Sequence, residues 1–157
     1  MSVPSTPARI RAARPYDAAA LLDLKRQLDA ETAFMIYEPD ERDTSVQDLA
    51  VELAGGSFRR SRATAYVVIG VRADAAGLGI GTGLLRQAKD WAAAHGLHRL
   101  ELTVMAHNTR AIRLYERMGF SVEGRRSECL LVDGQFIDEL TMAVILPASP
   151  SVDAAEP

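Results

Sequence analysis

The sequence predicts a single α/β (α+β) domain in which helices flank a mixed sheet. An apolar run at Tyr66–Val71, a glycine-rich turn, an amphipathic helix at Leu84–His95 and an alternating strand at Arg99–Met105 together form a strand–helix–strand unit with parallel strands. Two strand-like runs near the C-terminus are joined by Asp133–Gly134, which favours an antiparallel hairpin. The length of 157 residues suits one domain.

Composition limits the function classes that need to be considered. The net charge is −3, so there is no global case for nucleic-acid binding. Cys129 is the only cysteine, which excludes an intrachain disulfide and is typical of a reducing compartment. The sequence shows neither a signal peptide nor an apolar stretch of the roughly 20 residues that span a membrane. We therefore expect a cytoplasmic protein that binds no membrane and no nucleic acid.

The domain is expected to cover residues 9–146, between two disordered tails. Residues 1–8 contain several Pro and Ser residues, and residues 147–157 are low in apolar content, so both predict disorder. Arg9–Arg14 is a short candidate strand at the start of the domain.

Two helices are predicted before the glycine-rich turn. The first has Asp17 as its N-cap and runs to about Thr32, with leucines at helical spacing. The second begins at Ser45 and ends at Gly55–Gly56, because paired glycines stop a helix. An alternative interpretation makes Leu49–Gly56 the remnant of a strand, in which case the second helix is lost.

The glycine-rich turn predicts an anion site. Gly77, Gly79 and Gly81 occupy alternate positions, which allows the backbone to approach a ligand, and the free amides of the next helix favour a phosphate. A dinucleotide-binding loop is excluded because in neither register does the third glycine fall where it is required. A P-loop is excluded because no lysine follows the last glycine. The alternative is a strand-to-helix turn with no ligand. Gly70, inside the preceding apolar run, indicates a close backbone approach.

The remaining elements follow from periodicity and capping. Asn108 is a plausible cap for a helix at Thr109–Met118. The hairpin strands are expected at Phe120–Val132 and Gln135–Leu146. The helix at Leu84–His95 is expected to bury one face against the sheet. That face consists of Leu84, Leu85, Ala88, Trp91, Ala92 and His95.

Two motifs in this order resemble the GNAT superfamily of N-acetyltransferases. They are GLGIGTGLL at Gly77–Leu85 and NTRAIRLYERMGF at Asn108–Phe120. The resemblance covers Tyr66–Leu146 well and the N-terminal third loosely. It implies a GNAT-like mixed central sheet with a parallel, splayed strand pair and flanking helices. A third signature looks like bacterial members that acetylate small amines or protein N-termini, and it consists of Asp133, Gly134, Asp138, Glu139 and Met142.

The resemblance implies acetyl-CoA as the cosubstrate and no metal. The pyrophosphate would lie on the main-chain amides of the glycine loop, and the pantetheine arm would run beside the Tyr66–Val71 strand, where a side chain at Gly70 would crowd it. Asn108 would bind the arm or an ordered water. The implied cofactor-binding residues are Ile69, Val71, Gly77, Leu78, Gly79, Ile80, Gly81, Thr82, Asn108 and Tyr115. A helix edge with Arg110, Arg113 and Arg117 could meet the 3′-phosphate, although a solvated face is the favoured interpretation.

By the same resemblance, Tyr115 would lie near the thioester sulfur. A phenol of pKa ~10 can protonate a leaving thiolate whose thiol has a pKa of ~8.5. The attacking amine must be neutral, so a base is also needed; Glu101 is the first candidate, and Glu123 and Glu128 are weaker ones. Alternatively, Tyr115 is a core aromatic residue and each glutamate is a solvated surface group.

Two features depart from the family pattern. Ala76 stands where the family usually has Arg or Gln, so a side-chain contact to phosphate is lost. Gly55–Thr64 is too short for the antiparallel hairpin that the family places before the cofactor strand. The hairpin of the second and third strands is therefore expected to be missing or shortened, which leaves the substrate wall incomplete. Such a chain is expected to be weakly stable or to need a partner, for example in a homodimer.

The predicted function is an acetyl-CoA-dependent N-acetyltransferase in which a primary amine attacks the thioester directly. The acceptor would be a small amine, a polyamine, an amino acid or a protein N-terminus. An acyl-CoA-binding module without catalysis is the alternative, motivated by Ala76 and the missing hairpin. A generic nucleotide-binding α/β domain is a third interpretation.

Overall fold

A computed structural model describes residues 11, 13–32, 34, 42 and 63–147 of the chain. The helix predicted from Ser45, the alternative strand at Leu49–Gly56, the shortened hairpin and the two tails, apart from Pro147, lie outside the described residues. The elements in chain order are η1 (Pro15–Asp17), α1 (Ala18–Glu31), β1 (Thr64–Tyr66), η2 (Ala73–Ala75), α3 (Ile80–Ala94), β2 (Arg99–Met105), α4 (Thr109–Arg117), β3 (Ser121–Val132) and β4 (Gln135–Ile145).

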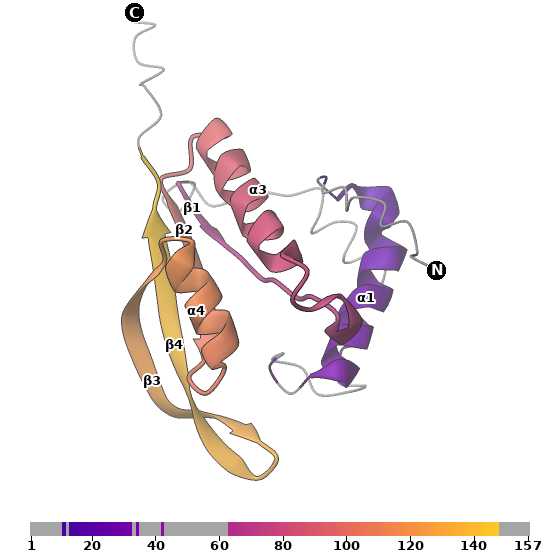
Figure 1. The fold of residues 1–157 in the computed structure, drawn as a ribbon, viewed down its shortest axis with the longest axis vertical. Coiled ribbons are helices and arrows are strands. Elements are labelled where there is room, and N and C mark those ends of the chain that lie inside the picture. Colours follow the sequence, from indigo (N-terminus) through magenta and orange to yellow (C-terminus); the bar gives the residue numbers. More distant parts are fainter. Residues whose placement is uncertain (1–10, 12, 33, 35–41, 43–62, 148–157) are drawn as a thin grey trace, which may run out of the picture.

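The four described strands form one mixed sheet in the order β1-β2-β4-β3 (Figure 1). β1 is parallel to β2, whereas β2 and β3 are both antiparallel to β4, so the predicted α/β fold with a mixed sheet is confirmed. Asp133 and Gly134 join β3 to β4 with φ values of 48° and 76°. Two consecutive positive φ values suit the twist of a two-residue hairpin, as the sequence predicted.

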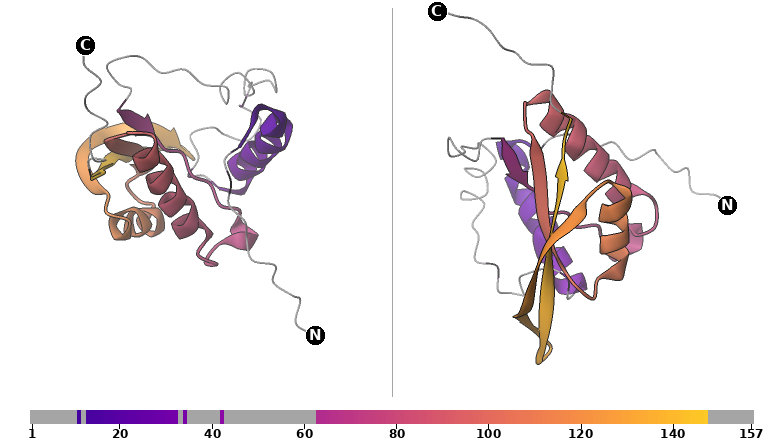
Figure 2. Two further views of the ribbon diagram at one scale, coloured as in Figure 1. Left: turned by 90° about the horizontal axis from the view of Figure 1, so that it is seen from above. Right: turned by 90° about the vertical axis from the view of Figure 1, so that its left-hand side faces the viewer.

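Helices lie on both sides of this sheet. α3 and α4 cover one face, and α1 lies on the other side, beside the chain that follows β1 (Figure 2). The pleat of β2 directs Leu100, Leu102 and Val104 toward α3 and α4, which explains their alternation with polar residues. The main core consists of Leu85, Ala92, Leu100, Leu102, Val104, Tyr115, Phe120, Met142, Val144 and Leu146.

The strand before the glycine loop is shorter and earlier than predicted. β1 pairs with β2 only over Thr64–Tyr66, and the last bond runs from the Val67 amide to the carbonyl of Glu101 at 2.8 Å. Beyond it the chain leaves β2, so residues 68–71 form no strand. Val68 is 69% exposed, which makes the prediction of a buried strand at this position wrong. The result is a parallel pair that splays apart.

α3 begins at Ile80 rather than at Leu84. Gly79 is its N-cap with a left-handed φ of 78°, and the Gly83 amide donates to the Gly79 carbonyl at 3.0 Å. The helix therefore takes in part of the glycine-rich turn. Trp91, which we expected on the buried face, is 51% exposed and stacks on His95 with ring centroids 4.1 Å apart.

Two predictions at the N-terminal end need correction. Of the candidate strand at Arg9–Arg14, residues 11, 13 and 14 are described, and none of them is in a strand. The predicted helix is present as α1 with Asp17 at its N-cap position, but the Asp17 side chain makes no capping hydrogen bond to α1. Its carboxylate accepts a hydrogen bond from the Arg14 amide at 2.9 Å and pairs with Arg11, so it closes η1 instead.

The C-terminal part of α1 packs against the chain that follows β1. A Cβ on Gly70 would lie 2.3 Å from Leu28 Cδ1, so this glycine allows α1 to approach closely. This packing is a reason for glycine that is independent of the predicted crowding of a cofactor arm, which stays a prediction. The Ala73 amide donates to Glu31 Oε2 at 3.0 Å, and buried Asp29 pairs with Arg42. None of the helices in the described residues combines the length and the hydrophobicity of a membrane span.

Candidate active site

A cavity of about 750 Å³ lies where the chain after β1 separates from β2. Residues 67–71 line one side of it, and Thr103, Val104 and Met105 line the other. The glycine loop, the beginning of α4 and the end of α1 complete the wall. This volume is typical of a small-molecule site. Splaying of the parallel pair therefore creates the space that a ligand would occupy.

Nearly all the predicted cofactor-binding residues line this one cavity. They are Ile69, Val71, Gly77, Gly79, Ile80, Gly81, Thr82, Asn108 and Tyr115. Leu78 is the exception, because it does not line the cavity and is 74% exposed. Their common location brings together segments that are separated in sequence, from the end of β1 to the middle of α4.

The chain after β1 offers main-chain groups to the cavity. Within the described residues, the amides of Val68, Ile69, Gly70 and Val71 donate to no main-chain carbonyl, because the last ladder bond belongs to Val67. Backbone polar groups in a protein are normally paired with protein, water or ligand. An extended ligand with amide groups could pair with them as an additional strand would.

The glycine loop presents the start of α3 to the same space. Gly77 and Gly79 adopt left-handed φ values of 85° and 78°, which favour glycine. Gly81 has a different reason, because it lies inside α3 and a Cβ there would be 3.0 Å from Leu114 Cδ2 of α4. Gly77 and Gly79 therefore shape the loop, whereas Gly81 lets α4 pack beside the first turn of α3. The free amides of that turn form an anion site.

Asn108 begins α4 and also lines the cavity. Its Oδ1 accepts a hydrogen bond from the Ala111 amide at 3.1 Å, so the predicted cap is confirmed. Tyr115 lies on the same helix and is 8% exposed, with its ring 6.0 Å from that of Phe120. Burial, and to a smaller extent the nearby Tyr66, raise the pKa of the Tyr115 phenol above its usual value.

The Tyr115 hydroxyl is open to the cavity although its ring belongs to the core. In the described part of the chain, the hydroxyl has no hydrogen-bond partner. The described residues contain no buried side-chain oxygen or nitrogen without a hydrogen-bond partner, so this unpaired oxygen is not buried. The oxygen must therefore be accessible from the cavity that Tyr115 lines. A protonated phenol in this position can donate a proton to a bound molecule.

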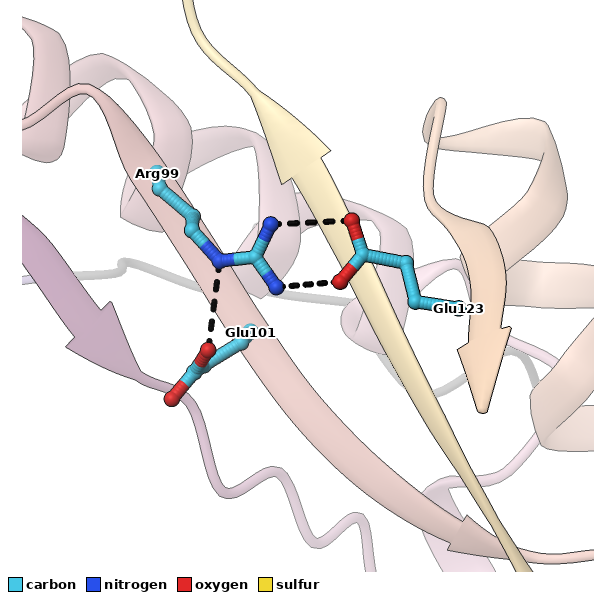
Figure 3. Close-up of polar contacts among 3 residues, drawn as sticks. All are labelled: Arg99, Glu101 and Glu123. Carbon is cyan, nitrogen blue, oxygen red and sulfur yellow. Dashed lines mark hydrogen bonds and ion pairs between the residues drawn. The ribbon is translucent and has the colours of Figure 1, made fainter. Parts of the chain in front are cut away.

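Glu101, the first candidate for the base, does not line the cavity. It accepts a hydrogen bond from Arg99 Nε at 3.2 Å, and the same guanidinium binds both carboxylate oxygens of Glu123 (Figure 3). The hydrogen bond from Arg99 lowers the pKa of the Glu123 carboxyl. Glu128 is exposed, lies in a bulge with a φ of 51°, and donates its amide to Asp138. The catalytic role of Glu101 stays a prediction.

Three residues of the cavity were not singled out from the sequence. Tyr66 Oη lies 2.6 Å from Thr103 Oγ1, and it accepts a bond from the Thr103 amide at 3.2 Å, where the strands separate. Glu139 is 6% exposed, lines the cavity and accepts a bond from Arg126 at 2.8 Å. Only a weak sequence signal pointed to two of them: Tyr66 lies at the end of β1, and Thr103 lies on the polar face of β2. Glu139 was part of the hairpin signature but received no role.

Comparison with known proteins identifies the family. The model of the acetyltransferase (GNAT) family matches residues 7–120, which is most of the chain. The chain belongs to the GNAT acetyltransferase family. A GNAT family acetyltransferase from Streptococcus pneumoniae has a TM-score of 0.80 at 25% identity, covering 87% of this chain and 98% of its own. The GNAT fold that the sequence predicted is confirmed.

Two further relatives extend this comparison. The [ribosomal protein uS5]-alanine N-acetyltransferase of Escherichia coli is 39% identical over 51 residues, which are 32% of this chain and 26% of that protein. The chain therefore spans about a quarter of the length of this curated relative. The structure of yncA from Salmonella typhimurium with its cofactor acetyl-CoA is 21% identical and has a TM-score of 0.78, covering 96% of this chain and 100% of its own. This likeness supports the fold.

Proposed function

We propose that the protein is an acetyl-CoA-dependent N-acetyltransferase that acts on a primary amine. The observation that carries this proposal is the shared cavity. One space joins the glycine loop at the start of α3, the main-chain amides after β1 that have no partner in the described chain, and the accessible hydroxyl of Tyr115. Family membership and the acetyl-CoA in a structural relative support the identity of the ligand.

The cosubstrate would contact each part of the cavity wall. Its diphosphate would bind the amides at Gly77–Thr82, where two left-handed glycines and a helix N-terminus favour an anion. Its pantetheine arm has amide groups that can pair with the main chain at Ile69 and Val71. Asn108 would bind the arm or a water molecule next to it. These contacts would direct the thioester toward Tyr115, which lies farther along the same cavity wall.

The chemistry needs an acid and a base. The amine nitrogen attacks the thioester carbonyl carbon, and a main-chain amide of residues 68–71 stabilises the resulting oxyanion. The carbon–sulfur bond then breaks, and Tyr115 gives its proton to the departing thiolate. Because burial raises the pKa of Tyr115, the phenol holds this proton at neutral pH until the thiolate forms. A base removes the proton of the amine, and the phenolate recovers a proton from solvent.

Two carboxylates are candidates for the base. Glu101 was predicted from the sequence and would have to act through a chain of waters, because it does not line the cavity. Glu139 lines the cavity and is buried, and we therefore propose it as the better-placed group. The acceptor would be a small amine, a polyamine, an amino acid or a protein N-terminus, and a cationic acceptor would share the Glu139 carboxylate with Arg126. A reducing, cytoplasmic location suits the lone Cys129 thiol.

A non-catalytic acyl-CoA-binding module is the second candidate. Ala76 offers the cofactor phosphates no polar side chain, which is the feature that favours a protein with weakened activity. A third possibility, binding of a different nucleotide, would appear as ATP or NAD competing with CoA. All three share the cavity, and they differ in which ligand binds and in whether acetyl transfer occurs.

The test combines calorimetry with acetyl-CoA and a thiol-release assay across a panel of amines. For the wild type we expect binding and release with at least one amine. For Tyr115→Phe we expect release to fall by about 100-fold, because general acid catalysis contributes at least that much, with acetyl-CoA affinity within about twofold. The phenyl ring keeps the core packing. Binding without release on any amine would favour the module, and unchanged release by Tyr115→Phe would remove the proposed acid.

A further inference from the structure

Arg110 places a guanidinium beside the glycine loop. It is the second residue of α4, and its Nη2 lies 3.8 Å from the position that a Cβ would take on Gly77. Arg110 and Gly77 both line the cavity. The packing of Leu114 against Gly81 fixes this approach, because it holds the first half of α4 next to the first turn of α3.

Folding alone does not explain a positive charge at this position. Within the described residues, Arg110 has no hydrogen bond or ion pair. Arg72, by contrast, pairs with Glu31 and Asp74. The first turn of a helix carries a partial positive charge, so an arginine at the second position is electrostatically unfavourable. The first turns of α3 and α4 and the Arg110 guanidinium, which has no ion pair among the described residues, therefore all border this cavity.

We infer that Arg110 binds the diphosphate of the cosubstrate at the glycine loop. This inference rests on the proposed function. A planar guanidinium can donate two parallel hydrogen bonds to phosphate oxygens, and it would supply at Gly77 the side-chain contact that neighbouring Ala76 cannot make. Arg110 thereby becomes a cofactor-binding residue directed at the diphosphate, distinct from its neighbours along the helix edge. Arg117 also lines the cavity but stands at the other end of α4, and Arg113 does not line it.

The test measures the affinity of the full-length chain for two probes by calorimetry. CoA carries both the diphosphate and the 3′-phosphate, whereas dephospho-CoA keeps only the diphosphate. We expect Arg110→Ala to weaken the binding of both probes by at least about tenfold, because even one hydrogen bond to a charged group contributes that much. Arg113→Ala is the matched control, because it removes the same charge from the same helix away from the cavity, and it should change either affinity by less than about twofold.

Each other result has a defined meaning. Weakening of CoA alone would assign Arg110 to the 3′-phosphate and overturn the inference, as would an equal loss in Arg113→Ala or no loss in Arg110→Ala. If the wild type binds neither probe, the proposed function itself fails. If the wild type binds both probes tightly and Arg110→Ala has the same affinities, only the inference about Arg110 is overturned.

Two further readouts separate binding from a structural role. The melting temperature of Arg110→Ala should equal or exceed that of the wild type, because a cation leaves the first turn of α4. Arg110→Lys keeps the charge without the paired donors and should give an intermediate affinity. A melting temperature that falls together with affinity in both variants would show that Arg110 supports folding and would contradict the inference.

Discussion

Tyr115 has a ring in the core and a hydroxyl that faces the cavity. Its ring is part of the core between α4 and β2, and its hydroxyl opens into the cavity without a partner among the described residues. The ring fixes the position of the oxygen, and burial keeps the proton on it by raising the pKa. The two interpretations that the sequence left open, core aromatic and catalytic acid, are therefore compatible.

The two candidate bases can be separated by isosteric substitutions. Glu139→Gln should lower turnover by at least about tenfold, because a general base commonly contributes more than that. Glu101→Gln should lower it by less than about twofold, because its carboxylate does not line the cavity. Steady-state thiol release with the best amine measures both. A larger loss in Glu101→Gln than in Glu139→Gln would restore the prediction made from the sequence.

At the scale of elements, the position of α1 depends on a contact with the chain after β1. Gly70 does not have a positive φ, so its backbone would accept alanine, yet the new Cβ would collide with buried Leu28. We expect Gly70→Ala to lower the free energy of unfolding by about 1–3 kcal/mol through overpacking. Urea titration measures this change.

The matched control removes the Leu28 side chain with which the new Cβ would collide. In a Leu28→Ala background, Gly70→Ala should cost less than about 0.5 kcal/mol, because the two residues are coupled by direct contact. Equal costs in the two backgrounds would show that the loss has another origin, such as a changed path of the chain after β1. The cycle therefore reports directly on the packing of α1.

Local patterns predicted most elements but not their separation in space. Arg99–Met105 and the hairpin turn follow from alternation and turn chemistry, and α4 follows from its cap and its glycine stop. The end of β1 could not be predicted in this way. The point at which β1 separates from β2 depends on long-range packing and not on the local sequence around Tyr66 and Val68. For the same reason the sequence missed Thr103 and Glu139, which reach the site only because their strands border the gap.

At the scale of the whole molecule, a splayed parallel pair, a glycine loop and a buried phenol enclose one site between helices on both sides of a mixed sheet. The predicted family and fold are confirmed, because both depend on short motifs in a fixed order, whereas the ligand-binding roles of the individual residues stay predictions. The predicted domain limits of 9–146 and the homodimer stay predictions.

The most direct test of this account is a crystal structure of the protein with CoA. We predict that the diphosphate lies on the amides of Gly77–Thr82 and that the arm follows residues 67–71. The sulfur should then lie beside the hydroxyl of Tyr115. Ordered CoA outside this cavity, or a sulfur that Tyr115 does not face, would contradict the account.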